Sequence, residues 1–188
     1  MKAQRAAQDR RESAPQKRLP LTGLAVGGVA LLVLGFLAYG LLSGPSTAFQ
    51  PGSPVPGFQL TALDGTAMHL AEQRGSVVVL NFFASWCAPC REEAAGLESV
   101  WRDYQLQGVQ FYGIAYKDAE SKVQVFLDEF GITYPIAVEP GNRTARAYGV
   151  TGVPETFVVD QDGLLVKHYI GPVSQAQLGT VLDSLAGQ

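Results

Sequence analysis

Apolar and polar positions along residues 58–188 repeat with two periods, one typical of strands and one typical of helices. Short apolar runs predict strands at 76–84, 109–116, 136–138, 155–160 and 164–170. Apolar positions three and four residues apart predict helices at 89–107, 123–130, 142–148 and 174–185. An Asp64-Gly65 turn predicts a β-hairpin before the first long strand. This order of elements predicts an α/β three-layer sandwich with a mixed sheet.

An uncharged segment of 22 residues, Leu21 to Leu42, precedes this domain. A helix of that length spans about 33 Å, enough for the ~30 Å hydrocarbon core of a membrane. Residues 1–18 carry a net charge of +4, which predicts that they stay in the cytoplasm. We therefore expect a transmembrane helix at 19–42, acting as a signal anchor, and a domain at 58–188 outside the cytoplasm.

A cleaved signal peptide is the alternative interpretation of the N-terminal segment. Its apolar region is usually only ~7–15 residues long, but the small residues at 46–48 would suit a signal peptidase. In both interpretations the domain lies outside the cytoplasm. Residues 43–57 hold four prolines and three glycines, which predicts a linker.

The charge of the remaining chain limits the class of partner. Residues after position 18 carry a net charge of −7, which argues against nucleic acid and anionic lipid. The two histidines of the chain, His69 and His168, are isolated in the sequence. We interpret both as surface or hydrogen-bonded residues. We expect no metal, no cofactor and a monomer with one hydrophobic core.

The only two cysteines, Cys87 and Cys90, stand between a predicted buried strand and a predicted helix. The free N–H groups and the dipole at a helix N-terminus favour a thiolate, so Cys87 is a candidate nucleophile. Pro89 suits the first turn of such a helix, where its missing N–H matters little. The spacing favours dithiol–disulfide exchange.

Three other interpretations of the cysteines are weaker. A structural disulfide stabilises mainly by closing a long loop, and a two-residue gap gains little. A zinc site usually needs about four ligands. A protease-type thiol needs a histidine partner, which nothing in the sequence marks.

Three segments carry a resemblance to a known family: NFFASWCAPCR at 81–91, GIAYKD at 113–118 and YGVTGVPETF at 148–157. Over about residues 52–186 the chain resembles the thioredoxin fold, in its membrane-tethered TlpA/ResA-like branch. It is most similar to the CcmG/DsbE thiol:disulfide interchange proteins of cytochrome c maturation. The segment 117–138 matches the insertion that this branch carries.

The resemblance implies a role for each residue around the cysteines. Cys87, at an exposed helix start, would attack a partner's disulfide, and Cys90 would resolve the mixed disulfide by forming the Cys87–Cys90 bond. Pro154 corresponds to the family's cis-proline, which leaves the Val153 backbone free to pair with a substrate strand. Trp86 would shield the sulfurs, or is simply a packed aromatic residue.

Asn81 is a departure from cytoplasmic thioredoxins, which have an aspartate there to handle the proton of the second cysteine. Asparagine cannot do this. Glu93 lies on the same predicted helix face as Cys90, whereas Glu92 should face water. Burial should raise the pKa of Glu93 toward the range useful for proton transfer, so we assign it a proton-relay role. An ordinary first-turn glutamate is the alternative.

Glu155 follows Pro154 directly and is expected near the rim of the site. It would tune the thiols or select basic partners, or it is an exposed glutamate at a strand edge.

The resemblance implies an extracytoplasmic protein-disulfide reductase at a bacterial cell membrane. Its clients would be thiol proteins such as apocytochrome c, and a membrane donor of the CcdA/DsbD type would reduce it again. A DsbA-type oxidant is an alternative, although Ala88-Pro89 lacks that group's histidine. A non-catalytic client-binding module is another. A peroxiredoxin-type peroxidase would need a hydroxyl where Ala84 stands.

Overall fold

The computed structural model describes residues 31–36 and 49–186 of the chain. The predicted cytoplasmic segment 1–18 and most of the predicted transmembrane helix 19–42 lie outside these residues. Residues 31–36 are helical. Among the residues described, no helix has both the length and the apolar character needed to cross a membrane.

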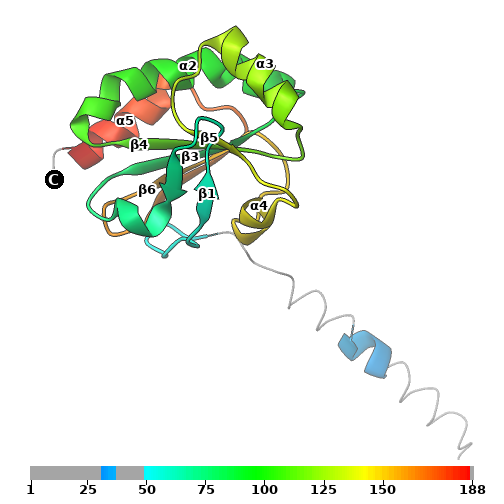
Figure 1. Ribbon diagram of the computed structural model, residues 1–188. Coiled ribbons are helices and arrows are strands. Elements are labelled where there is room, and N and C mark those ends of the chain that lie inside the picture. The colour runs from blue at the N-terminus through cyan, green and yellow to red at the C-terminus, as the bar shows by residue number, and fades with distance from the viewer. Residues whose placement is uncertain (1–30, 37–48, 187–188) are drawn as a thin grey trace, which may run out of the picture. The chain divides into compact units, whose positions relative to one another are not determined.

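A five-stranded sheet with the order β5-β4-β3-β6-β7 forms the centre of the domain (Figure 1). Strands β3 (Val78–Phe83), β4 (Gln110–Ala115) and β5 (Ile136–Val138) run parallel to one another. Strands β6 (Glu155–Val159) and β7 (Leu165–Ile170) are antiparallel additions. A separate hairpin consists of β1 (Gln59–Thr61) and β2 (Ala67–His69). The predicted mixed sheet and N-terminal hairpin are confirmed.

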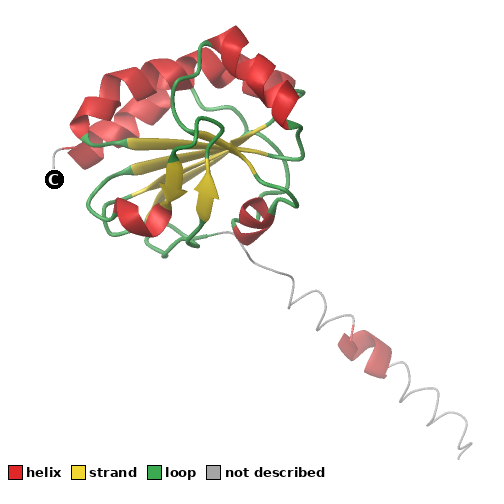
Figure 2. Ribbon diagram, viewed as in Figure 1, coloured by secondary structure: helices red, strands yellow, loops and turns green. Residues whose placement is uncertain are grey.

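Helices cover both faces of the sheet, which makes three layers (Figure 2). One face carries α2 (Ala88–Tyr104), α3 (Glu120–Phe130) and α5 (Gln175–Ala186), and the short helix η2 (Gln105–Gln107) follows α2. The other face carries α4 (Arg143–Ala147), η1 (Leu70–Gln73) and the hairpin. Each interface has its own apolar cluster, one around Val79 and Leu178, the other around Phe82 and Tyr148.

Burial explains why β3 is apolar at every position except Asn81. All six of its residues are buried, because β3 is the central strand and both of its faces are covered. Its carboxyl end leads into α2, so the middle strand of the sheet delivers the Cys-x-x-Cys segment to a helix N-terminus.

Ser174 caps the start of the last helix, α5. Ser174 Oγ accepts a hydrogen bond from the Gln177 N–H, and Gln177 Oε1 accepts one from the Ser174 N–H, which is a reciprocal capping box.

Residues 52–55, within the proline- and glycine-rich segment, run along the edge of the sheet. Pro54 forms an antiparallel bridge with Leu164, and the Gly52 N–H donates to the Leu165 carbonyl. This covers part of β7, an edge strand whose free backbone groups would otherwise face solvent.

Candidate active site

Cys87 is the N-cap residue of α2, and its Sγ accepts a 3.2 Å hydrogen bond from the Cys90 N–H. Pro89 lies in the first turn of the helix, as predicted. Cys87 and Cys90 form a disulfide with their Cα atoms 5.3 Å apart. The helix N-terminus therefore offers an N–H group directly to the sulfur of Cys87, which is where a thiolate gains from it.

The sulfur of Cys87 is more enclosed than the sequence suggests. In the disulfide form, Cys87 is only 4% exposed and Cys90 1%. The carbonyl oxygen of Val153 lies 3.4 Å from Cys87 Sγ and covers it from the loop before β6. The expectation of an exposed Cys87 is wrong for this form, because a segment 66 residues further along the chain folds over it.

Trp86 is 61% exposed, so it is not a packed core aromatic. Its indole Nε1–H donates to the carbonyl of Lys117 at 3.3 Å. The neighbouring Ser85 N–H donates to Asp118 Oδ2 at 2.6 Å. The loop after β4 thus holds the turn that leads from β3 to Cys87.

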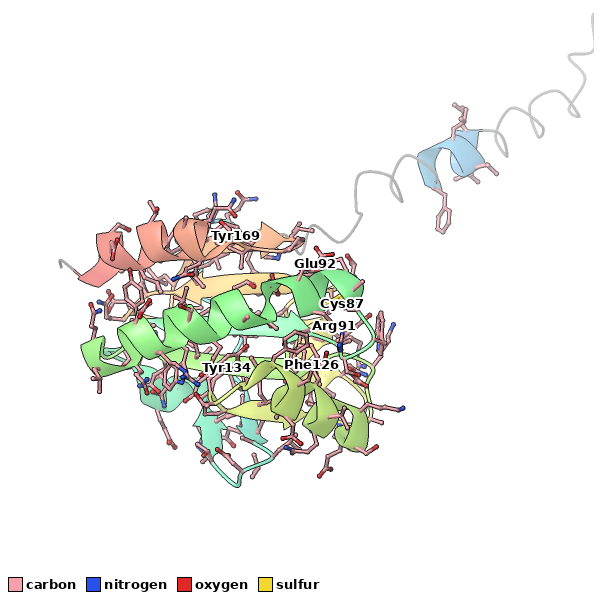
Figure 3. All side chains as sticks on the ribbon, turned by 90° about the horizontal axis from the view of Figure 1, so that it is seen from above. Cys87, Arg91, Glu92, Phe126, Tyr134 and Tyr169 are labelled. Atoms are coloured by element: carbon pink, nitrogen blue, oxygen red, sulfur yellow. A yellow bond between two sulfur atoms is a disulfide. The ribbon has the colours of Figure 1, made fainter. Side chains whose placement is uncertain are left out.

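Two charged residues follow Cys90 on different sides of α2 (Figure 3). Arg91 points toward α3, where its guanidinium lies 5.0 Å from the centroid of the Phe130 ring and pairs with Glu129. Glu92 lies on the side away from α3 and is exposed, as predicted.

Glu93 is buried one helical turn beyond Cys90, on the core face of α2. Its Oε1 accepts a 3.0 Å hydrogen bond from Asn81 Nδ2, and its Oε2 accepts a 2.8 Å hydrogen bond from the Val173 N–H. Asn81 also donates to Thr156 Oγ1 at 2.9 Å. Residues from β3, β6, α2 and the loop before α5 thereby form one buried polar network beneath the disulfide.

Burial raises the pKa of Glu93 from 4.5 to about 7. The hydrogen bonds from Val173 and Asn81 act in the opposite direction, since they favour the carboxylate, but desolvation is the larger effect. A carboxyl group that titrates near neutral pH can both accept and release a proton there.

The Val153–Pro154 peptide bond is cis, as the resemblance implies. Val153 is partly buried and Pro154 is buried beside the disulfide-facing loop. The Val153 carbonyl contacts Cys87 Sγ, so this cis peptide bond lies beside the cysteines, as the resemblance implies.

Glu155 is not an exposed strand-edge residue, and that expectation is wrong. It is 3% exposed, because β6 lies between β3 and β7 rather than at an edge. One oxygen accepts hydrogen bonds from the N–H groups of Thr151 and Gly152, and the other lies 2.8 Å from His168 Nε2. The interpretation of His168 as a hydrogen-bonded residue is confirmed.

Sequence reasoning did not identify three residues that support the site. Val173 and His168 each bond to a buried carboxylate, and Asp118 holds the turn before Cys87. Asp118 lies within the GIAYKD segment, whose family resemblance could have identified it. No local pattern marks the other two.

The fold and the paired sulfurs define a class of protein: a thioredoxin-like α/β domain built for dithiol–disulfide exchange. Among residues 31–36 and 49–186, no group of three or more histidine, cysteine, aspartate or glutamate side chains gathers as a metal site would require.

Comparison with known proteins gives the family. Residues 51–168 match the model of the AhpC/TSA family. The thiol-disulfide oxidoreductase ResA of Geobacillus thermodenitrificans is 32% identical over 155 residues, covering 82% of this chain and 89% of that protein.

Solved structures of thiol:disulfide interchange proteins have a similar fold. A protein from Chlorobium tepidum described as the thiol:disulfide interchange protein DsbE matches with a TM-score of 0.69 and 27% identity, over 74% of this chain and all of that one. A thioredoxin-family thiol:disulfide interchange protein from Chlorobium tepidum TLS matches with a TM-score of 0.67 and 30% identity, over 73% and 98% of the two chains. The chain belongs to the AhpC/TSA family and, within it, to the thiol-disulfide oxidoreductases of the ResA and DsbE type.

Proposed function

We propose that this protein reduces disulfides in exported proteins at the outer face of a bacterial cell membrane. The observation that carries the proposal is the stack of Cys87 at the helix N-terminus, Cys90 one turn inward and the buried Glu93 one turn further. This arrangement supplies a nucleophile, a resolving thiol and a proton acceptor from a single helix.

The reaction begins with the reduced pair. The Cys87 thiolate attacks one sulfur of the client disulfide, whose other sulfur leaves as a thiolate and takes a proton from solvent. Cys90 then gives its proton to Glu93 and attacks the Sγ of Cys87. The mixed disulfide breaks, the second client sulfur leaves, and two electrons have passed to the client while the Cys87–Cys90 bond forms.

Pro154 and Val153 supply the surface on which the client lies. The Val153 carbonyl faces the sulfur of Cys87 at 3.4 Å, so a client chain running along this segment would bring its own sulfur to the same place. Trp86, exposed beside Cys87, and Pro89 in the first helical turn would flank it.

The clients would be thiol proteins, with apocytochrome c and its haem-binding cysteines as the proposed case. A membrane electron donor of the CcdA/DsbD type would then return the disulfide to the dithiol. Membership of the ResA- and DsbE-type family supports this assignment.

The N-terminal segment would hold the enzyme at the membrane. Residues 19–42 would span it once, residues 1–18 would stay in the cytoplasm, and 43–57 would link the span to the domain. An intact residue 1 in the detergent-solubilised membrane fraction is the expected result. Loss of the segment, with cleavage near residues 46–48, would instead indicate a signal peptide.

The client is identified with the full chain carrying Cys90→Ala. This variant cannot resolve its mixed disulfide, so the client stays attached to Cys87 and can be identified by mass spectrometry after release with a reductant. The double variant that also carries Cys87→Ser is the matched control. Equal recovery of a protein with both variants would contradict a covalent exchange.

The direction of electron transfer follows from the reduction potential. A potential well below about −200 mV supports a reductant, and one near about −120 mV would make the protein an oxidant.

A further inference from the structure

A second buried carboxylate lies on the other face of the sheet from Glu93. The side chain of Glu155 is 4% exposed, and that of its partner His168 is 19% exposed. The two come from neighbouring strands, β6 and β7, and the reaction as written above uses neither. A buried carboxylate needs partners for its oxygens, so the identity of those partners shows what it holds in place.

Glu155 holds the backbone immediately before the cis-proline. Its Oε1 accepts the N–H groups of Thr151 at 3.1 Å and Gly152 at 3.3 Å. The next residue, Val153, is the one whose carbonyl lies against Cys87 Sγ. The position of one carboxylate oxygen therefore sets the path of the segment 151–153 past the sulfur.

His168 fixes the orientation of that carboxylate. Its Nε2 lies 2.8 Å from Glu155 Oε2, whereas the two backbone N–H groups donate to Oε1. The imidazole ring stacks on Phe157, with 4.0 Å between the ring centroids and 13° between the planes. Phe157 is fully buried, so the ring has a rigid support. Without His168, Oε2 would lose the one side-chain partner it has among residues 31–36 and 49–186, and the carboxylate could rotate.

We propose that His168 is a positioning residue for disulfide exchange with polypeptides. Through Glu155 it holds the segment 151–153 in place beside the sulfur of Cys87, where a client chain would pair. This inference rests on the proposed function, because it assumes that the client lies along Val153. It further predicts that the preference for an extended polypeptide disulfide over a small one depends on a residue far from the cysteines in sequence.

The experiment uses the full chain in the reduced form, with two oxidants of different size. One is a synthetic peptide with a single disulfide, and the other is bis(hydroxyethyl) disulfide, which is too small to pair along a strand. The rate of reduction is followed as a function of concentration for the wild type, His168→Ala and His168→Gln. His69→Gln is the matched control, because His69 forms a comparable 2.8 Å pair with Glu72 on the surface.

For His168→Ala we expect the half-saturating concentration of peptide to rise about 10-fold, in keeping with the loss of one charge-assisted hydrogen bond. The limiting rate and the rate with the small disulfide should change by less than about twofold, and the reduction potential should stay at the wild-type value. His168→Gln, whose amide can still donate to Glu155, should recover most of the affinity, and His69→Gln should match the wild type.

Equal slowing with both oxidants, or an unchanged half-saturating concentration of peptide in His168→Ala, would overturn the positioning role while leaving the proposed function intact. A wild-type protein that reduces neither oxidant would overturn both. If His168→Ala does not fold, the variant Glu155→Gln answers the same question, because glutamine keeps the size of the side chain but has one acceptor oxygen where the carboxylate has two. Unaltered peptide affinity in Glu155→Gln would equally refute the inference.

Discussion

Asn81 Nδ2 donates a 3.0 Å hydrogen bond to Oε1 of Glu93, linking the middle of β3 to the second turn of α2. An uncharged donor can orient the carboxylate without adding a second titrating group. The pKa of Glu93 therefore reflects a balance in which burial outweighs two hydrogen bonds, and that balance can be tested by substitution.

Glu93→Gln should make the folded protein more stable at neutral and alkaline pH. Between pH 4.5 and about 7 the folded state holds a proton on Glu93 that the unfolded state has released. The free energy of unfolding contributed by this group is therefore highest below about pH 4.5 and falls as the pH rises through that window. The full loss is on the order of 3 kcal/mol. Since glutamine has one acceptor oxygen for two donors, we expect a net gain of only ~1–2 kcal/mol.

Urea unfolding of the oxidised protein across this pH range measures the effect. Glu92→Gln, on the exposed side of the same helix, is the control and should keep the wild-type slope. If the free energy of unfolding depends on pH in the same way in Glu93→Gln and in the wild type, Glu93 does not titrate between pH 4.5 and about 7.

Glu93→Gln should also slow the resolution step by about 10- to 100-fold, because the Cys90 proton loses its nearby acceptor. The inflection of the rate near pH 7 should disappear as well. Rapid-quench measurement of the mixed disulfide formed with a small disulfide reports this step directly. Resolution at the wild-type rate, with the inflection kept, would remove the relay role.

Asn81→Asp should place two carboxyl groups in hydrogen-bond contact. Like charges at that distance cannot both ionise easily, so the pKa of one of them should rise further. We expect the pair to titrate above the Glu93 pKa of about 7 and the protein to lose ~2–4 kcal/mol of stability at alkaline pH. Carboxyl signals in NMR spectra recorded during a pH titration follow this. An unshifted Glu93 signal in the variant would mean that the two side chains are not in contact.

Two glycine substitutions test the packing around the site. A Cβ at Gly113, in β4 beside Asn81, would overlap Cδ1 of Ile136 and press on the Phe83 ring, so Gly113→Ala should lower stability by ~1–3 kcal/mol. A Cβ at Gly96, within α2, would meet no atom within 4 Å. Gly96→Ala should therefore raise stability by ~0.5–1 kcal/mol. Thermal unfolding of the two variants should move in opposite directions, and a shared direction would refute this description of the core.

The sequence predicted the elements of the domain well, because each has a strong local signal. The apolar run of β3 and the Asp64-Gly65 turn are both short-range features. The helix face shared by Cys90 and Glu93 follows from helical geometry alone, and both side chains are buried as that geometry requires.

The pair of Glu155 and His168 could not be predicted in this way. Near the turn, Val159 faces Leu165, and continuing this register would place His168 on the opposite face of the sheet from Glu155. An irregularity between Val158 and Val159 shifts the pairing by one residue, so that Phe157 faces His168 and Glu155 faces Ile170. One inserted residue thus decides which side chains meet across β6 and β7, and no local sequence pattern predicts this insertion.

The enclosure of Cys87 was missed for a related reason. Its cover comes from Val153, and only the assembled sheet brings that loop to the start of α2. Contacts between residues so far apart depend on the whole fold, whereas the N-cap position of Cys87 depends on its immediate neighbours.

The central claim is that Cys87, in the reduced protein, is an ionised and reachable sulfur with Cys90 protected beneath it. The rate of alkylation by iodoacetamide as a function of pH, with the modified residue identified by mass spectrometry, tests this most directly. We expect Cys87 to react first, at a rate that has already reached its plateau near neutral pH. A rate that keeps rising to about pH 8.5, as for a free cysteine, or preferential modification of Cys90, would contradict the account.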